Sequence, residues 1–520
     1  MRIEHFKTYT LLHTWAGIIA GLLLYICFVA GALSMFEEPL DRWALQTNAS
    51  LPPIAAEKYD QLIQQVFTEY PESKRNMTVY LPHAQPQHAP IFWEIENPQT
   101  HQHTLWHATL GPNDELIAEQ ASVSAIGSFI DDLHRTAGIP GGEGHDAIGT
   151  YVMGIVAAIY FLAIISGLIV FLPGWFKDLF AVRRGKNRKR FWLDAHNILG
   201  ISALPFHIVI AITTVAFAYH DVFYDSLRAM VYKDTPMFSR AAPHTAELKF
   251  SDLASIQQLS DGITSIEPEF KPAVMNFRGI DTPGALVFIG GEVVGQWVRG
   301  PYYAYAGSNP YTAQPGYTIM LPSQQSTMAK IVNGFFSLHF GGFGGATVRW
   351  LYFLMGLSGS LLFITGNILW IEKRQKKQKN EADTVKQKRS TVVMARLTVG
   401  VGIGTLMGIA LAILAARWLP HTQVDIGWWQ KLAYYIGFLL CIAWAFLQAP
   451  VRAAKQQLIL LVVLCGLLLF SALNQYDRMN LEGINIGFSI VAASISGALL
   501  STLSWLRRRE SLMSRDSAWV

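Results

Sequence analysis

The chain has 520 residues, 51% of them hydrophobic and only 15% charged, whereas about a quarter of the residues in a typical soluble protein are charged. This composition argues against an ordinary soluble protein and indicates a membrane protein. The formal net charge of +4 is accounted for by basic loops beside the membrane, so it does not indicate a nucleic-acid partner.

Eight hydrophobic runs are long enough to cross about 30 Å of hydrocarbon, which takes about 18 residues or more. They lie at about residues 9–36, 147–172, 196–220, 346–370, 393–417, 429–449, 456–474 and 484–506. The first run is too long for a signal peptide and lacks a clear cleavage site, so we expect a retained anchor. The sequence thus predicts a mainly α-helical membrane protein with about eight transmembrane helices.

The basic residues between these runs predict the orientation of the chain. They cluster at Arg2 and Lys7, across 183–190, across 373–389, at Arg452 and Lys455, and across 507–509. With eight spans all five clusters fall on one side, which predicts that both termini are cytoplasmic. We expect a multi-pass protein of a bacterial inner membrane, with loops 37–146 and 221–345 in the periplasm.

Each of the two periplasmic loops reads as a helix followed by strands. The first has a helix at 59–67, strands at 78–81, 91–95 and 104–110, and a turn at 111–114; the second has a helix from Ser251 and strands at 273–277 and 285–289. This shared order predicts a duplicated small α+β module. The expected domains are 1–36 (first span), 37–146 (first module), 147–220 (second and third spans), 221–345 (second module), 346–370 (fourth span), 371–392 (cytoplasmic linker), 393–506 (four further spans) and 507–520 (cytoplasmic tail).

Fifteen histidines are present, and five of those in or beside the first four spans are candidate ligands; His145 and His220 also lie near the outer surface. His13 and His196 lie on the cytoplasmic side, His134 and His339 lie on the outer side, and His207 lies near the middle of the third span. A single histidine in a membrane can simply bond to a neighbouring helix, but ionisable residues there are usually functional. Neutral imidazole binds iron, and an apolar porphyrin suits the interior of a helix bundle. The two layers of histidines therefore predict two haem b groups, each bound by two histidines.

The depth of each histidine predicts the pairing. His13 and His196 would bind the inner haem, and His134 and His339 the outer one, with His207 as an alternative outer ligand. In a continuous third span, His196 and His207 would share a face about 16 Å apart, unless Pro205 bends the helix. Small residues would allow helices to approach a flat macrocycle closely; they are Gly17, Gly21, Gly31, Gly356, Gly359 and Gly366.

Other candidate motifs carry less weight. The three cysteines, Cys27, Cys441 and Cys465, lie in apolar spans and form no C-x-x-C-H site, so we expect no covalent c-type haem. The outer histidines at 83, 88, 101, 103 and 107 match no strong metal motif and read as loop and strand residues. The segment LHFGGFGG at 338–345 lacks the Gly-Lys-Ser/Thr ending of a phosphate loop, which favours a tight turn at the membrane surface.

Four short blocks resemble those of the PepSY-associated transmembrane family, which includes inner-membrane siderophore reductases of the ferrioxamine-reductase type. They are LHTWAG at 12–17, DLHR at 132–135, DAHNILG at 194–200 and LHFGGFGG at 338–345. The resemblance covers roughly residues 1–375. It implies a four-span core with PepSY-like periplasmic modules, two b-type haems and a role in iron acquisition, with His13, His134, His196 and His339 at the matching histidines.

Two features depart from that pattern. Ala195 and Asn197 flank His196 where Leu-His-Arg is commoner, and four further spans follow the core. We expect an oxidoreductase that takes electrons from quinol or a cytoplasmic reductant and reduces a ferric siderophore in the periplasm. Its other expected partner is membrane lipid, and we expect no nucleic-acid partner. Two alternatives remain: a transporter of iron chelates or peptides, and a periplasmic binding or sensing protein anchored by its helices.

Overall fold

The computed structural model forms two compact units, and each is described by itself. It describes residues 3–44, 51, 54–82, 84, 89–96, 103–121, 125–142, 147–175, 183, 188–233, 252–376, 385–419, 425–473, 482–510 and 517–520. The helical unit comprises Met1–Ala44, Ala125–Phe223 and Leu351–Val520. The sheet unit comprises Leu45–Ser124 and Tyr224–Trp350.

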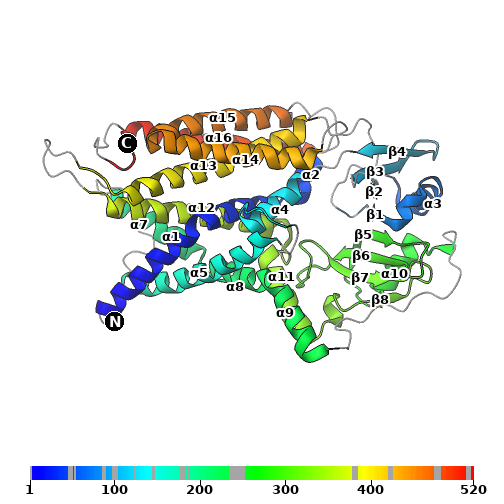
Figure 1. Ribbon diagram of the computed structural model, residues 1–520. Coiled ribbons are helices and arrows are strands. Elements are labelled where there is room, and N and C mark those ends of the chain that lie inside the picture. The colour runs from blue at the N-terminus through cyan, green and yellow to red at the C-terminus, as the bar shows by residue number, and fades with distance from the viewer. Residues whose placement is uncertain are drawn as a thin grey trace. The chain divides into compact units, whose positions relative to one another are not determined.

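Long apolar helices build the helical unit (Figure 1). They are α1 (Ile3–Ser34), α5 (Ile148–Phe171), α7 (Arg188–Ser202), α8 (Leu204–Ala218), α12 (Gly345–Arg374), α13 (Arg389–Trp418), α14 (Ile426–Leu447), α15 (Pro450–Leu473) and α16 (Glu482–Glu510), and the shorter helices are α2 (Glu37–Ala44), α4 (Ile126–Thr136) and α9 (His220–Leu227). In the described part of the chain, seven helices are long and apolar enough to span a membrane, and α7 with α8 would form an eighth crossing. The protein is therefore a multi-pass membrane protein.

The third predicted span is broken. Its two parts, α7 and α8, meet at Ala203 and are bent by 68°. Pro205 lies in the first turn of α8, where its ring removes a donor and clashes with the preceding turn. A shared face for His196 and His207 was predicted only for an unbent span, and the exception named for Pro205 applies, because the helix is broken between the two histidines.

The four C-terminal helices pack into the same unit as the first spans. Helix α13 contacts α14 and α15, and it also contacts α1. The Tyr25 hydroxyl of α1 donates to the Gly402 carbonyl of α13 over 2.7 Å. At the C-terminus, the Trp519 indole donates to the Glu372 carboxylate of α12 over 2.9 Å. The linker that was expected at 371–392 joins helices of one compact unit, and residues 377–384 within it lie outside the described residues.

The sheet unit is built on one continuous antiparallel sheet with the order β4-β3-β2-β1-β5-β6-β7-β8 (Figure 1). Its strands are β1 (Asn76–Tyr80), β2 (Ile91–Glu96), β3 (His103–Leu110), β4 (Leu116–Ala121), β5 (Lys271–Arg278), β6 (Leu286–Glu292), β7 (Ala304–Ser308) and β8 (Pro315–Tyr317). The first strand of each half pairs with the first strand of the other, with Thr78 opposite Asn276. The two expected modules thus share one sheet.

Two helices cover one face of this sheet, α3 (Tyr59–Glu69) and α10 (Ile256–Thr264). Alternating strand residues such as Met77, Val79, Met275 and Phe277 point into a common core with both helices. A capping box between Ser255 and Gln258 starts α10, later than the helix start expected at Ser251, which lies outside the described residues. Helix α11 (Thr327–Phe340) completes the unit.

Candidate cofactor site in the helical unit

The rings of His13 and His196 lie next to each other inside the helical unit. His13 comes from α1 and His196 from α7, and their ring centroids are 6.0 Å apart. Nδ1 of His13 lies 2.8 Å from the Ala163 carbonyl oxygen of α5. Because a carbonyl oxygen only accepts, this Nδ1 carries the proton, and the lone pair is on Nε2.

His196 is oriented in the same way from another helix. Its Nδ1 lies 3.2 Å from the Leu362 carbonyl oxygen and 3.2 Å from the Thr365 hydroxyl, both on α12. The carbonyl again places the proton on Nδ1 and leaves Nε2 as the metal-binding atom. Hydrogen bonds of this kind fix the tautomer and the orientation of metal-binding histidines.

Two glycines make room for these rings. A Cβ on Gly167 of α5 would lie 2.7 Å from Cε1 of His13, and a Cβ on Gly366 of α12 would lie 3.4 Å from Cε1 of His196. The first distance is shorter than real Cβ contacts allow. Any larger residue at Gly167 would therefore displace the His13 ring.

The geometry of this pair fits a shared metal. A metal–imidazole bond is about 2 Å long and the ring centroid lies about 1 Å behind the nitrogen, so two rings on opposite sides of one iron have centroids about 6 Å apart. The observed separation matches this value. The pair that was predicted for the inner site is thus brought together with both Nδ1 atoms already bonded.

His207 lies deep among aromatic rings. It is 1% exposed, and the Leu199 backbone is a polar group close to its ring. The rings of Phe28, Tyr160 and Phe206 lie around it, with centroids 5.7–6.1 Å from its own. A buried imidazole in such an apolar setting is a candidate ligand for haem iron.

His134 lies on α4, within the helical unit. Its Nδ1 lies 3.0 Å from the Cys27 carbonyl oxygen of α1, and a Cβ on Gly31 would lie 2.5 Å from the same nitrogen. Burial opposes the charged ring, while Cys27 and Asp131 favour it, and together they raise the pKa of His134 to about 9. An imidazole must be neutral to bind a metal, so binding at His134 would release a proton.

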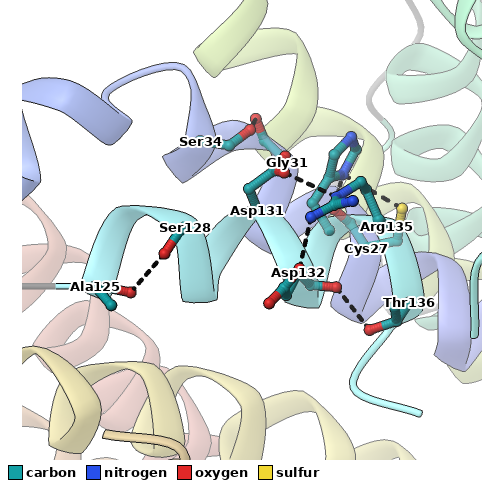
Figure 2. A network of polar contacts seen from close by, with 10 residues as sticks. Cys27, Gly31, Ser34, Ala125, Ser128, Asp131, Asp132, Arg135 and Thr136 are labelled. Carbon is teal, nitrogen blue, oxygen red and sulfur yellow. Dashed lines mark hydrogen bonds and ion pairs between the residues drawn. The ribbon is translucent and has the colours of Figure 1, made fainter. Parts of the chain in front are cut away.

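Charged residues on α4 surround this position (Figure 2). The Arg135 guanidinium pairs with Asp131 over 2.8 Å and with Asp132 over 2.6 Å. Figure 2 shows Arg135 above α4, next to Cys27 and Gly31 of α1. Burial, and next the Asp131 charge, raise the pKa of the nearby Glu37 carboxyl on α2 to about 7. This end of the helical unit thus holds a cluster of acidic residues, of which Glu37 is partly neutralised.

His339 belongs to the sheet unit, on α11, where its ring lies 5.5 Å from that of Phe340. Its pairing with His134 stays a prediction. Of the outward-facing histidines, His83, His88 and His101 lie outside the described residues, whereas His107 is a buried residue of β3 whose ring stacks on Phe92. No group of three or more His, Cys, Asp or Glu residues able to hold a metal ion occurs in the described part of the chain.

Several residues around the site were not singled out in the sequence. Gly167 and Thr365 position the two inner histidines, and Phe28 and Tyr160 line the space around His207. Asn367 of α12 is a polar residue within an apolar span. Such residues are functional candidates by default, so this one could have been found from the sequence alone.

Comparison with known families finds a match for this chain. The model of a family described as "PepSY-associated TM region" matches residues 10–373, which is more than half of the chain. The chain belongs to the PepSY-associated transmembrane family. The match includes α1, α5, α7, α8 and nearly all of α12, and therefore all five candidate histidines, whereas α13–α16 lie beyond it. A search of the curated proteins finds no significant match.

Proposed function

We propose that the protein is a di-haem b oxidoreductase that passes electrons across the inner membrane to a ferric siderophore in the periplasm. One observation carries the proposal: the His13 and His196 ring centroids lie 6.0 Å apart, and a carbonyl of α5 holds Nδ1 of His13 while a carbonyl of α12 holds Nδ1 of His196. Membership of the PepSY-associated transmembrane family supports it.

For the inner site, the chain supplies two neutral imidazoles and a dry setting. The Ala163 and Leu362 carbonyls orient the rings, and the Thr365 hydroxyl adds a second contact to His196. Gly167 and Gly366 leave space beside the two rings. Holding ligands in this way raises their basicity and favours one ring orientation.

For the outer site, we propose His134 and His207 as the ligands. Both approach the same stretch of α1, since His134 touches Cys27 and Gly31 while His207 packs against Phe28. His207 is also 1% exposed, and its ring is surrounded by those of Phe28, Tyr160 and Phe206. The other pairing is His134 with His339, and haem counts of His207→Ala and His339→Ala decide between the two.

Haem b supplies reversible one-electron chemistry at its iron, which the protein tunes through ligands, hydrogen bonds and burial. The substrate is the ferric ion of the chelate, which accepts one electron and becomes ferrous. Ferrous iron is a softer cation that binds the hard oxygen ligands of a siderophore less tightly. No general acid or nucleophile is required of the chain. Quinol or a cytoplasmic reductant would supply the electron.

Reduction of a ferric hydroxamate by the purified protein in liposomes tests this function. Ferrous iron would be trapped by a coloured chelator, with a quinol as the reductant. We expect His13→Ala and His196→Ala to slow the reaction at least about tenfold, while His5→Ala, at an exposed position on α1, leaves it unchanged. Equal rates in all four proteins would contradict the proposal.

The same liposomes separate the alternatives. A transporter would carry the chelate into the vesicle without forming ferrous iron. A periplasmic binding or sensing protein would bind the chelate equally well in His13→Ala and His196→Ala. If the protein contains no haem and gives either result, the corresponding alternative would take the place of the proposed reductase function.

A further inference from the structure

Two buried hydrogen-bond donors near His13 and His196 have no hydrogen-bond partner among the described residues. Asn367 is 1% exposed and Trp370 is 7% exposed. Within the described residues, neither Nδ2 of Asn367 nor Nε1 of Trp370 has a hydrogen-bond partner. Each unpaired donor costs about 1–3 kcal/mol, so two on one helix call for a ligand.

These donors share one face of α12 with a cation. Asn367, Trp370 and Arg374 are spaced three and four residues apart, which places them along one side of the helix. The Arg374 guanidinium carbon lies 4.2 Å from the Trp370 ring centroid and 5.6 Å from that of Trp15 on α1. The face thus offers two neutral donors and one positive charge.

This face adjoins the inner histidine pair. Asn367 follows Gly366, where a Cβ would lie 3.4 Å from Cε1 of His196. Trp370 lies about 6 Å from Gly366 along the helix axis. Oδ1 of Asn367 lies 3.4 Å from where a Cβ on Gly21 would be, so the side chain packs against α1. Helix α1 carries His13. The two donors therefore lie between α12, which orients His196, and α1, which carries His13.

We propose that Asn367 and Trp370 donate hydrogen bonds to the carboxylate side chains of the haem held by His13 and His196, with Arg374 as the neighbouring cation. This inference rests on the proposed function. Haem b carries two carboxylates on one edge, and a buried carboxylate needs donors or a cation. With the carboxylates held by these donors, that edge would lie near Arg374, at the end of α12 that is predicted to be cytoplasmic.

The test is a spectroelectrochemical titration of purified protein at several pH values. Trp370→Phe removes the N–H but keeps a ring for Arg374 to stack on, and Asn367→Leu removes the amide at similar volume. Gln430→Leu is the matched control, because Gln430 of α14 is a fully buried amide whose polar atoms also lack partners within the described residues. His13→Ala identifies which midpoint potential belongs to the inner haem.

We expect the inner midpoint to fall in both variants, because a carboxylate without donors keeps its full negative charge and disfavours an added electron. The reduction equilibrium constant should change by up to about tenfold, which is about 59 mV for one electron. Losing donors also raises a carboxylate pKa, so the inner midpoint should depend more strongly on pH across neutrality. The outer midpoint and the control should not change.

Unchanged midpoints in Trp370→Phe and Asn367→Leu, at full haem content, would overturn the inference while leaving the proposed function intact. Unchanged midpoints with slower reduction by quinol would also overturn it, because the donors would then serve a quinone carbonyl. If Asn367→Leu fails to retain haem, the inner midpoint potential of Trp370→Phe alone tests the inference. Wild-type protein without haem would instead refute the proposed function.

Discussion

Single side chains set the geometry of the candidate site. His13 and His196 come from α1 and α7, but the atoms that orient them belong to α5 and α12. Four helices must therefore assemble before either ring is fixed. The two ligands could be predicted from the sequence, because histidines in apolar spans are conspicuous. Their carbonyl partners could not, because every residue has a carbonyl and only packing selects Ala163 and Leu362.

Gly167→Ala should weaken the inner site. Its Cβ would approach Cε1 of His13 to 2.7 Å, so the ring must move away from the iron position. Disturbing residues that support a metal ligand typically costs about 10–100-fold in affinity, and haem retention during dilution measures this loss. Gly466→Ala, on α15, is the matched control, since a Cβ there meets nothing within 4 Å. Equal haem retention in both variants would show that Gly167 does not confine His13.

Glu37→Gln should stabilise the protein at high pH only. The pKa of Glu37 is raised from 4.5 to about 7, so unfolding releases its proton and stability falls as pH rises between these values. This loss of stability persists above about pH 7 and is absent below about pH 4. The free energy of unfolding falls by at most about 3 kcal/mol, and by about 1–2 kcal/mol once solvent screening is included. Melting temperatures of both proteins at about pH 8 and pH 4 measure it. A gain of equal size at both pH values would exclude the raised pKa as its cause.

At the scale of elements, the sequence predicted where helices and strands lie better than how they join. Strands β1, β2, β3, β5 and β6 were expected within a few residues, because alternating apolar residues mark them. Strands β4, β7 and β8 were missed, since β8 has only three residues and β4 and β7 are rich in small or polar residues. The pairing of β1 with β5 joins residues about 200 positions apart, and no local pattern encodes it. The break at Ala203 was foreseeable from Pro205, but its 68° angle was not.

Phe277→Ala should loosen both halves of the sheet. Phe277 of β5 is 1% exposed and lies opposite Met77 of β1, and removing such a core ring costs about 3–5 kcal/mol. Because the halves share one sheet, hydrogen exchange should speed up in β1 and β2 as well as in β5 and β6. Val294→Ala, at a highly exposed position, is the control. Faster exchange in β5 and β6 alone would show two independent modules.

At the scale of the whole molecule, the composition and the run lengths predicted a multi-pass membrane protein, and the helices and the family match support this. The orientation, with both termini cytoplasmic, rests on the basic loops and stays a prediction. Helices α13–α16 lie beyond the family match, yet α13 packs on α1 and the Tyr25 hydroxyl bonds to Gly402. Hydropathy alone could not show this attachment, because a lipid-facing and a helix-facing apolar residue look alike in sequence.

A haem count by pyridine haemochrome tests the central claim most directly. We predict two haem b groups per chain in the wild type, and one in each of His13→Ala, His196→Ala, His134→Ala and His207→Ala. Loss of one haem in His339→Ala, with both retained in His207→Ala, would assign the outer site to His134 and His339. A wild-type protein without haem, or variants of His13 and His196 that keep both groups, would contradict the account.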